Sequence, residues 1–489
     1  MDNQSMQVTT PATKENSTLD FVLNAFPFFA GLSLIYGIFF CICIYKNFSG
    51  ITSAFLAAGT LGYCLLIFRK LHIPLKKDAW FYMSGIQLCG ISDFMTDSAI
   101  LILLNDACML FLLYCFLLHH FFNDENWNPF TYFGAILVTF FGPFCSITLP
   151  FKSFSLYLTE KKTQKNTKFW YVVLGVFFSI PMLIVIVALL SSADAVFRNL
   201  TGYLFQDLFR FDNLFGILFT IAIGTFFSYG TILFLGGKNI ATETDSRTQE
   251  PVTAITFTSI LSVIYLVFCL IQITGLFLGR LTLPAEYTYA KYAREGFFQL
   301  LFVCMINLFL VLFCLRIFRP HRVLSWLLSL ISVCTYIMTV SSAMRMILYI
   351  QSYSLTFLRV FVLFALLVIF LIMTGILIYI YHPGFPLFRY CLYTVTVLYL
   401  VLSFSKPDYL IATYNLSQYN REEILEVPDY FYIENLSLDA FSAVIKYGDD
   451  ASFSSSYMSA AWEKTEDMNF RNFNISRYRV RQILIDQYQ

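Results

Sequence analysis

The chain has 489 residues, of which 58% are hydrophobic and 13% are charged, about half the charged share of a typical soluble protein. Its formal net charge is +1, and its mean hydropathy is +0.68. This composition excludes a soluble globular protein, a disordered chain and a nucleic-acid-binding protein, and it leaves the class of polytopic helical membrane proteins.

Long apolar runs fill the chain after a polar N-terminal tail of residues 1–23. A membrane-spanning helix needs roughly 20 apolar residues, because the hydrocarbon core is about 30 Å thick. Eleven runs meet this length, at approximately 24–45, 51–68, 99–118, 131–149, 169–190, 214–236, 252–279, 297–315, 323–350, 355–381 and 386–405. The sequence therefore predicts an all-α transmembrane bundle over 24–405.

A twelfth, shorter apolar run extends from Ala79 to Ile91 and is followed by Asp93 and Asp97. Gln87 interrupts this run, and we interpret it as a re-entrant or interfacial segment. If it spans the membrane, the number of spans rises to twelve and the predicted side of the N-terminus reverses.

Basic residues in the short loops predict the orientation, since cytoplasmic loops carry the excess of Lys and Arg. With eleven spans, sixteen basic residues fall on one side, including the clusters at 69–77 and 152–168, and six fall on the other. The loop 119–130 has no Lys or Arg and falls on the second side. We therefore expect the N-terminus in the cytoplasm and the C-terminal tail outside.

The tail from Lys406 to the C-terminus has a different character, with eight basic and thirteen acidic residues and no Cys. Leu438, Phe441, Val444 and Ile445 follow helical spacing, and Ser437 is a candidate N-cap. The pattern repeats near the end of the chain, at Val480, Ile483 and Leu484. We predict that 406–489 forms a small helical extracytoplasmic cap.

Ionisable residues inside membrane spans are candidates for function. The deepest acid is Asp106, which follows Asn105 in the predicted span 99–118 and is suited to bind a proton or a cation. The structural alternatives are a protonated acid and a hydrogen bond to a neighbouring helix. Asn307 and Gln272 are expected to form interhelical hydrogen bonds, and Arg345 and Arg359 are expected to snorkel to the interface.

Two predicted outer loops hold further charged residues. Asp194 lies in the segment SSADAVF, and Arg294 and Glu295 lie where a Tyr-rich loop enters the span 297–315. These three side chains either line a polar site in the outer leaflet or anchor helix ends within an aromatic belt, and the second interpretation is favoured.

No catalytic or metal-binding motif is present among those sought, which were HExxH, GxSxG and the phosphate-binding loop. The five His residues are scattered, with His119 and His120 adjacent at a predicted helix end, and all twelve Cys lie in hydrophobic segments. We therefore predict no catalytic residue, no metal and no cofactor.

Several segments resemble a family of uncharacterised bacterial membrane proteins. They include Leu283–Leu312, Pro251–Leu270, the SSADAVF segment, Lys406–Leu416 and Ile433–Gly448. The family is domain-of-unknown-function family four-one-seven-three, which is related to family four-one-five-three, and the resemblance covers roughly residues 170–489. It implies a bacterial membrane protein and no established activity.

Three functions are compatible with these features. The first is a non-enzymatic protein of the bacterial cytoplasmic membrane that transports, handles lipids or supports an envelope complex, with the cap as its binding element. The second is an intramembrane or outer-face lipid-linked enzyme that uses Asp194, Glu286, Arg294 and Glu295. The third is a membrane sensor or regulator. Membrane lipids are the expected partners, nucleic acid is not, and protein partners stay open.

Overall fold

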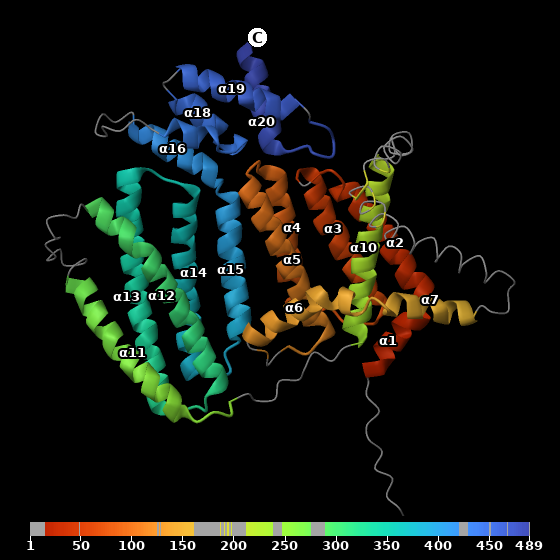
Figure 1. Cartoon of the computed structure of the whole chain (residues 1–489), viewed down its shortest axis with the longest axis horizontal. Helices are drawn as coiled ribbons and strands as arrows, with labels where there is room; N and C mark the ends of the chain where they lie inside the picture. Colours follow the sequence, from red (N-terminus) through yellow and green to blue (C-terminus); the bar gives the residue numbers. More distant parts are fainter. Residues whose placement is uncertain are drawn as a thin grey trace, which may run out of the picture. The chain divides into compact units, whose positions relative to one another are not determined.

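The computed structural model describes residues 15–160 (except 48, 125, 126 and 128), 212–237, 247–274, 289–419, 429–448, 451–466 and 468–488, with five isolated positions between 186 and 197. Every element in these ranges is a helix, apart from one isolated bridge between Gln249 and Phe318. The all-α prediction is therefore confirmed (Figure 1).

The chain divides into two compact units, which are described separately. Unit 1 comprises Met1–Phe48, Phe55–Lys76 and Ala135–Ile240. Its helices are α1 (Glu15–Asn24), α2 (Phe26–Ile44), most of α3 (Ile51–Lys70), most of α6 (Pro129–Cys145), α7 (Leu149–Glu160) and α10 (Asp212–Gly237). Helix α10 runs against α2 so closely that a Cβ atom on Gly37 would lie 2.2 Å from the Oγ1 atom of Thr225. Small residues that permit such an approach are typical of membrane helix pairs.

Unit 2 comprises Ser49–Ala54, Lys77–Gly134 and Ala241–Gln489. Its long helices are α4 (Ala79–Met95), α5 (Ala99–Phe121), α11 (Pro251–Gln272), α12 (Tyr289–Ile317), α13 (Arg322–Tyr353), α14 (Phe357–Tyr381) and α15 (Leu387–Phe404). The short C-terminal helices are α16 (Pro407–Tyr419), α17 (Tyr430–Glu434), η3 (Leu438–Ala440), α18 (Phe441–Tyr447), α19 (Ala451–Glu466) and α20 (Ile475–Tyr488).

Nine helices in the described ranges are long and apolar enough to cross a membrane. The count becomes ten if α6 and the start of α7, which are bent by 51° at a short break, form one span. The chain is thus a multi-pass membrane protein by the length and composition of its helices. The predicted span 169–190 falls outside the described ranges, apart from two isolated positions, so the predicted total of eleven or twelve is not tested there.

Polar side chains join α11, α12 and α13 inside unit 2. The Tyr265 hydroxyl donates to the Oδ1 atom of Asn307 at 2.6 Å, and the Nδ2 atom of Asn307 donates to the Thr335 hydroxyl at 3.0 Å. Gln272 accepts from Ser341 at 2.7 Å and from Arg345 at 3.1 Å. The interhelical roles predicted for Asn307 and Gln272 are therefore confirmed.

The prediction for Arg345 is wrong, because this residue is buried between helices and does not reach the interface. Its guanidinium donates to Gln272, and a Cβ atom on Gly296 would lie 2.0 Å from the Arg345 Nη1 atom. The absence of a side chain at Gly296 provides the space that the guanidinium occupies. Arg359 is half-buried: its guanidinium donates to the Tyr353 carbonyl at 2.6 Å and lies over the Tyr349 ring, and its snorkelling to the interface stays a prediction.

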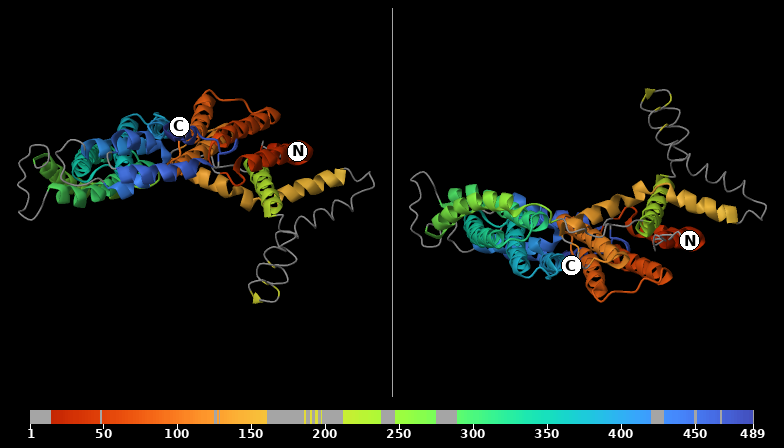
Figure 2. Two further views of the ribbon diagram at one scale, coloured as in Figure 1. Left: turned by 90° about the horizontal axis from the view of Figure 1, so that it is seen from above. Right: turned by 90° about the horizontal axis from the view of Figure 1, so that it is seen from below.

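The C-terminal helices share a hydrophobic core of their own. Leu438, Phe441, Val444, Val480 and Leu484 are all buried in it, as the helical spacing in the tail predicts. Ser437 precedes η3, but its side chain does not cap the helix, because its hydroxyl donates to Asp408 instead. Within unit 2, these helices cover one end of the long helices (Figure 1, Figure 2).

Helix α4 covers the short run 79–91, which the sequence predicts to be a re-entrant or interfacial segment, and it is not one of the nine candidate spans. It is a continuous helix of 17 residues, about 25 Å long, that runs antiparallel to α5 (Figure 1). At one end of this hairpin Asp93 contacts Asn105, and at the other Tyr82 lies beside His119. The loops before α4 and after α5 therefore lie at the same end, which contradicts their predicted placement on opposite sides.

Candidate functional site

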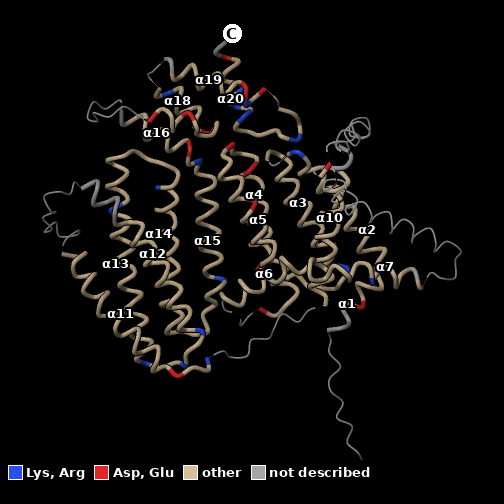
Figure 3. The backbone as a smooth tube through the Cα atoms, in the orientation of Figure 1, with Lys and Arg blue, Asp and Glu red and all other residues tan. Residues whose placement is uncertain are grey.

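A polar junction forms where the C-terminal helices meet the turn between α4 and α5. The turn is Thr96-Asp97-Ser98, three polar residues between two apolar helices. Thr96 has an extended backbone, which ends α4, and Ser98 precedes the first residue of α5. Acidic residues gather at this end of unit 2, whereas basic residues mark the opposite ends of α12, α13 and α15 (Figure 3).

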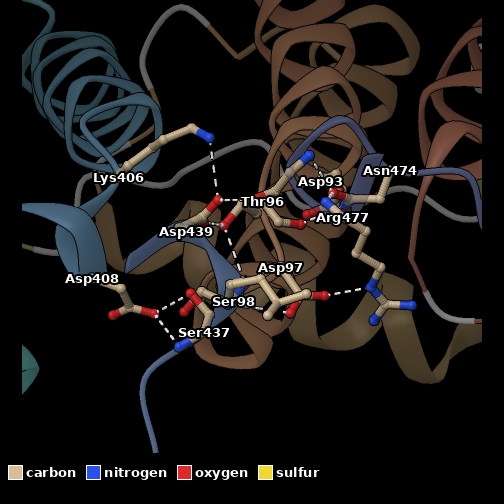
Figure 4. A network of polar contacts seen from close by, with 12 residues as sticks. Asp93, Thr96, Asp97, Ser98, Lys406, Asp408, Ser437, Asp439, Asn474 and Arg477 are labelled. Carbon is tan, nitrogen blue, oxygen red and sulfur yellow. Dashed lines mark hydrogen bonds and ion pairs between the residues drawn. The ribbon is translucent and has the colours of Figure 1, made fainter. Parts of the chain in front are cut away.

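Asp439 is the centre of the junction, and its side chain is only 1% exposed. The carboxylate accepts hydrogen bonds from the Thr96 hydroxyl at 2.5 Å and from the Ser476 hydroxyl at 2.5 Å, and it pairs with the Lys406 ammonium at 3.2 Å (Figure 4). These partners come from the α4–α5 turn, the start of α20 and the end of α15. One buried carboxylate therefore ties three distant parts of the chain together.

Arg477 and Asn474, from the start of α20, hold the same turn. The Arg477 Nε atom donates to Asp97 at 2.5 Å. The Asn474 amide donates to the carbonyls of Asp93 at 3.1 Å and of Thr96 at 2.7 Å. The last carbonyls of a helix have no partner within the helix, so Asn474 satisfies acceptors that the end of α4 leaves open (Figure 4).

Asp408 fixes η3 to α16. Its carboxylate accepts from the Ser437 hydroxyl at 2.5 Å and from the Ser437 backbone N–H at 3.3 Å. Burial raises the pKa of Asp408 above its ordinary value, and hydrogen bonds from Ser437 and Ser98 counteract part of that increase. The Tyr457 hydroxyl donates to the Ser437 carbonyl at 3.1 Å, which links α19 to the same point.

Behind the turn, the polar contacts continue between α4, α5 and α15. The Asn105 amide donates to Asp93 at 2.8 Å, and the Oδ1 atom of Asn105 accepts from Tyr399 at 2.6 Å and from Ser403 at 2.8 Å. The other Asp93 oxygen, Oδ2, is buried and has no hydrogen-bond partner in the described part of the chain. Such a group destabilises the fold unless a proton, water or ligand satisfies it.

The junction holds more carboxyl groups than basic groups. Four carboxyl groups, Asp93, Asp97, Asp408 and Asp439, face two cations, Lys406 and Arg477, within the described residues. Unbalanced buried charge is costly, so this end of unit 2 is suited to bind protons or cations. No group of three or more His, Cys, Asp or Glu side chains in the described ranges is arranged to hold a metal ion.

A second polar cluster lies at the other end of the α4–α5 hairpin. The His119 Nδ1 atom hydrogen-bonds the buried carboxylate of Asp124 at 2.7 Å, and the Tyr132 hydroxyl donates to that same carboxylate. Arg389 pairs with Asp78 at 3.0 Å and lies 3.7 Å from Asp124. His119 therefore lies in the last turn of α5, at the predicted helix end, where it is buried and paired with Asp124.

Asp106, the deepest acid of the predicted span, lies on the exposed side of α5, while its neighbour Asn105 is buried in the junction. A shift of one residue turns a helix by about 100°, so the two side chains face different surroundings. Asn105 is thus the residue that joins the junction, and a role for Asp106 as a proton or cation site stays a prediction. The polar run from Asp93 to Ser98 was the signal that marked the site.

Asp194, Arg294 and Glu295 are not brought together by any described contact. Asp194 is exposed, and its carboxylate accepts from the Phe197 backbone N–H at 2.8 Å, as in a local turn. Arg294 and Glu295 lie on α12 in unit 2, whereas Asp194 belongs to unit 1, and the side chains of Arg294 and Glu295 are outside the described residues. Glu286 also lies outside them.

Comparison with known proteins identifies a family but no characterised relative. The profile of a domain of unknown function, DUF4153, matches residues 83–447. No curated protein and no solved structure matches the chain. The match begins well before residue 170, at which the resemblance seen in the sequence starts, and it includes most of α4, all of α5 and most of the junction. The chain belongs to the DUF4153 family, and the first tag expected from the sequence, four-one-seven-three, is a different one.

Proposed function

We propose that this DUF4153 protein is a non-enzymatic component of the bacterial cytoplasmic membrane that serves the envelope in transport, lipid handling or as a scaffold. In this proposal the C-terminal helices form an extracytoplasmic cap, the N-terminus is cytoplasmic, and the cap is the element that binds a partner or solute. The basic loop 69–77 supports this orientation, since it precedes α4 at the end of the hairpin remote from the C-terminal helices.

The junction around Asp439 is the observation that carries the proposal. Asp439 accepts from Thr96 in the α4–α5 turn, from Ser476 at the start of α20 and from Lys406 after α15, and Arg477 donates to Asp97 in the same turn. These bonds restrict the movement of the C-terminal helices relative to the turn. Removal of one partner from a buried charged hydrogen bond costs roughly 1.5–3 kcal/mol. A cap held by several such bonds is suited to transmit a binding event at its surface to the membrane helices.

A deletion strain complemented with junction variants tests this function. We expect deletion to change lipid composition or survival under envelope stress, wild-type protein to restore it, and Asp439→Asn with Lys406→Gln to restore it only in part at equal abundance. Normal lipids and survival of the deletion strain under every envelope stress would contradict an envelope role. Full restoration by the double variant would contradict a role for the docked cap.

One observation supports an enzyme as the second candidate. Asp124 accepts from Nδ1 of His119, which leaves Nε2 as the free acceptor, the arrangement of a general base held by a carboxylate. The Nε2 atom is buried and, like the Tyr82 hydroxyl, has no hydrogen-bond partner in the ranges that the structure describes.

His119→Gln and its neighbour His120→Gln separate this candidate from the first. If the protein is an enzyme that uses His119, only His119→Gln abolishes complementation while the protein stays folded and abundant. Complementation by both variants contradicts the enzyme and leaves the first proposal standing.

A further inference from the structure

Two Phe side chains on the C-terminal helices are conspicuously exposed. Phe431 on α17 is 77% exposed, and Phe470 in the loop between α19 and α20 is 76% exposed. Other apolar side chains of this region, such as Phe441 and Leu484, are buried in the shared core. A single exposed apolar residue needs no explanation. The position of these two Phe residues relative to the membrane-spanning helices therefore decides whether they indicate a binding surface.

Phe470 lies beside the start of α3, a candidate membrane span. The Thr52 hydroxyl donates to the carbonyl of Arg471 at 3.3 Å, and the Ile51 backbone N–H donates to the carbonyl of Phe473 at 2.9 Å. These bonds satisfy polar groups of the first turn of α3, where the helix has no partners of its own. Phe470 is therefore held at the level where that span begins.

Phe431 has the same relation to the start of α14, which is also a candidate span. The next residue, Tyr432, accepts through its hydroxyl from the backbone N–H of Phe357 at 2.9 Å. Phe357 is the first residue of α14, and Leu358 after it is an exposed apolar residue. The segment that carries Phe431 is thus held at the first residue of this candidate span.

We infer that Phe431 and Phe470 insert into the headgroup–acyl boundary of the bilayer and attach the C-terminal helices to lipid at two points. The ends of membrane spans lie in this interfacial layer, where aromatic side chains are favoured. Burial of a Phe side chain contributes favourably in proportion to the apolar area removed from water. The partner is the phospholipid surface itself, and the inference depends on α3 and α14 being spans, not on the proposed envelope role.

Fluorescence quenching in bilayers tests this placement. The variants Phe431→Trp and Phe470→Trp are reconstituted separately in phosphatidylcholine vesicles whose acyl chains carry bromine either near the headgroup or near the terminal methyl group. The emission of the wild-type protein, which has five Trp residues, is subtracted to obtain the signal of the added Trp. We expect both added signals to be quenched, more strongly by bromine near the headgroup. Ala460→Trp is the matched control, because this exposed position lies on α19, whose helix neighbours are α18 and α20, and its signal should stay unquenched.

Hydrogen exchange of the unmodified protein provides a second measurement that no variant can disturb. We expect the backbone amides of 429–434 and 468–473 to exchange more slowly in lipid nanodiscs than in detergent, and those of 455–463 on α19 to exchange equally in both. Added Trp signals that are no more quenched than the control, or exchange that is equal in both media at all three segments, would overturn the inference.

Discussion

At the scale of single residues, Asp439 and Asp408 decide how the C-terminal helices attach to unit 2. Both carboxyl groups are buried, and both accept short hydrogen bonds from Ser or Thr hydroxyls. They differ in their partners: Asp439 pairs with the Lys406 ammonium, whereas Asp408 accepts hydrogen bonds from the uncharged side chains of Ser437 and Ser98. The two residues therefore give different predictions.

Asp439→Asn should loosen the C-terminal helices, because Lys406 and the donors of Thr96 and Ser476 lose a charged acceptor. We expect a loss of about 1–3 kcal/mol in the stability of this attachment. Hydrogen exchange of α20 measures it as faster exchange at residues 475–488. Glu434→Gln is the control, since this carboxylate makes only an exposed contact with Ser456 and its change should alter stability by no more than about 0.5 kcal/mol. Equal exchange in both variants would show that Asp439 does not hold the junction.

Asp408→Asn should remove a dependence of stability on pH. Burial raises the pKa of Asp408, so the folded protein binds this proton more tightly than the unfolded chain does. The contribution of Asp408 to the stability of the fold is complete below the pKa of about 3.9 that this group has in the unfolded chain. That contribution is lost as the pH rises through the higher pKa of the folded protein. Thermal unfolding from pH 4 to pH 7 should therefore favour wild type over Asp408→Asn most at pH 4. A difference between the two proteins that stays constant over this range would contradict the raised pKa.

At the scale of elements, the α4–α5 hairpin is the part of the fold that organises both polar clusters. Its turn carries Thr96, Asp97 and Ser98, and its open end carries Asp78, Tyr82 and His119. Arg389, near the start of α15, pairs with both Asp78 and Asp124, so it connects the chain before α4 with the chain after α5. This pairing is what places the two loops at one end.

Reporter fusions test this arrangement of the hairpin. Fusions truncated at Asp78 and at Asp124 should report the same side of the membrane, because Arg389 pairs with both carboxylates at one end of the hairpin. A fusion at Asp97 should report the other side. If Asp78 and Asp124 report opposite sides, α4 does not cross, and the eleven-span interpretation of the loops is restored.

At the scale of the whole molecule, the orientation in the membrane is still a prediction from the basic loops. We expect fusions at Lys165 and at the C-terminus to report cytoplasm and exterior, respectively. The C-terminal fusion should also agree with the fusion at Asp97, since Arg477 and Asn474 bond the turn that contains this residue. Cytoplasmic signals from both Lys165 and the C-terminus would contradict the proposed topology.

The sequence alone determined the class of this protein and most of its helices, because the length and apolarity that a membrane span requires are local properties of the chain. It also predicted the core of the C-terminal helices, where Phe441 and Leu484 follow helical spacing. The tertiary structure decided the site. Thr96 and Asp439 are 343 residues apart along the chain, and no local pattern indicates that a Thr in a turn will meet a distant Asp. Only packing selected Asn105 over Asp106 and buried His119 against Asp124, since both outcomes depend on which side of α5 faces other helices.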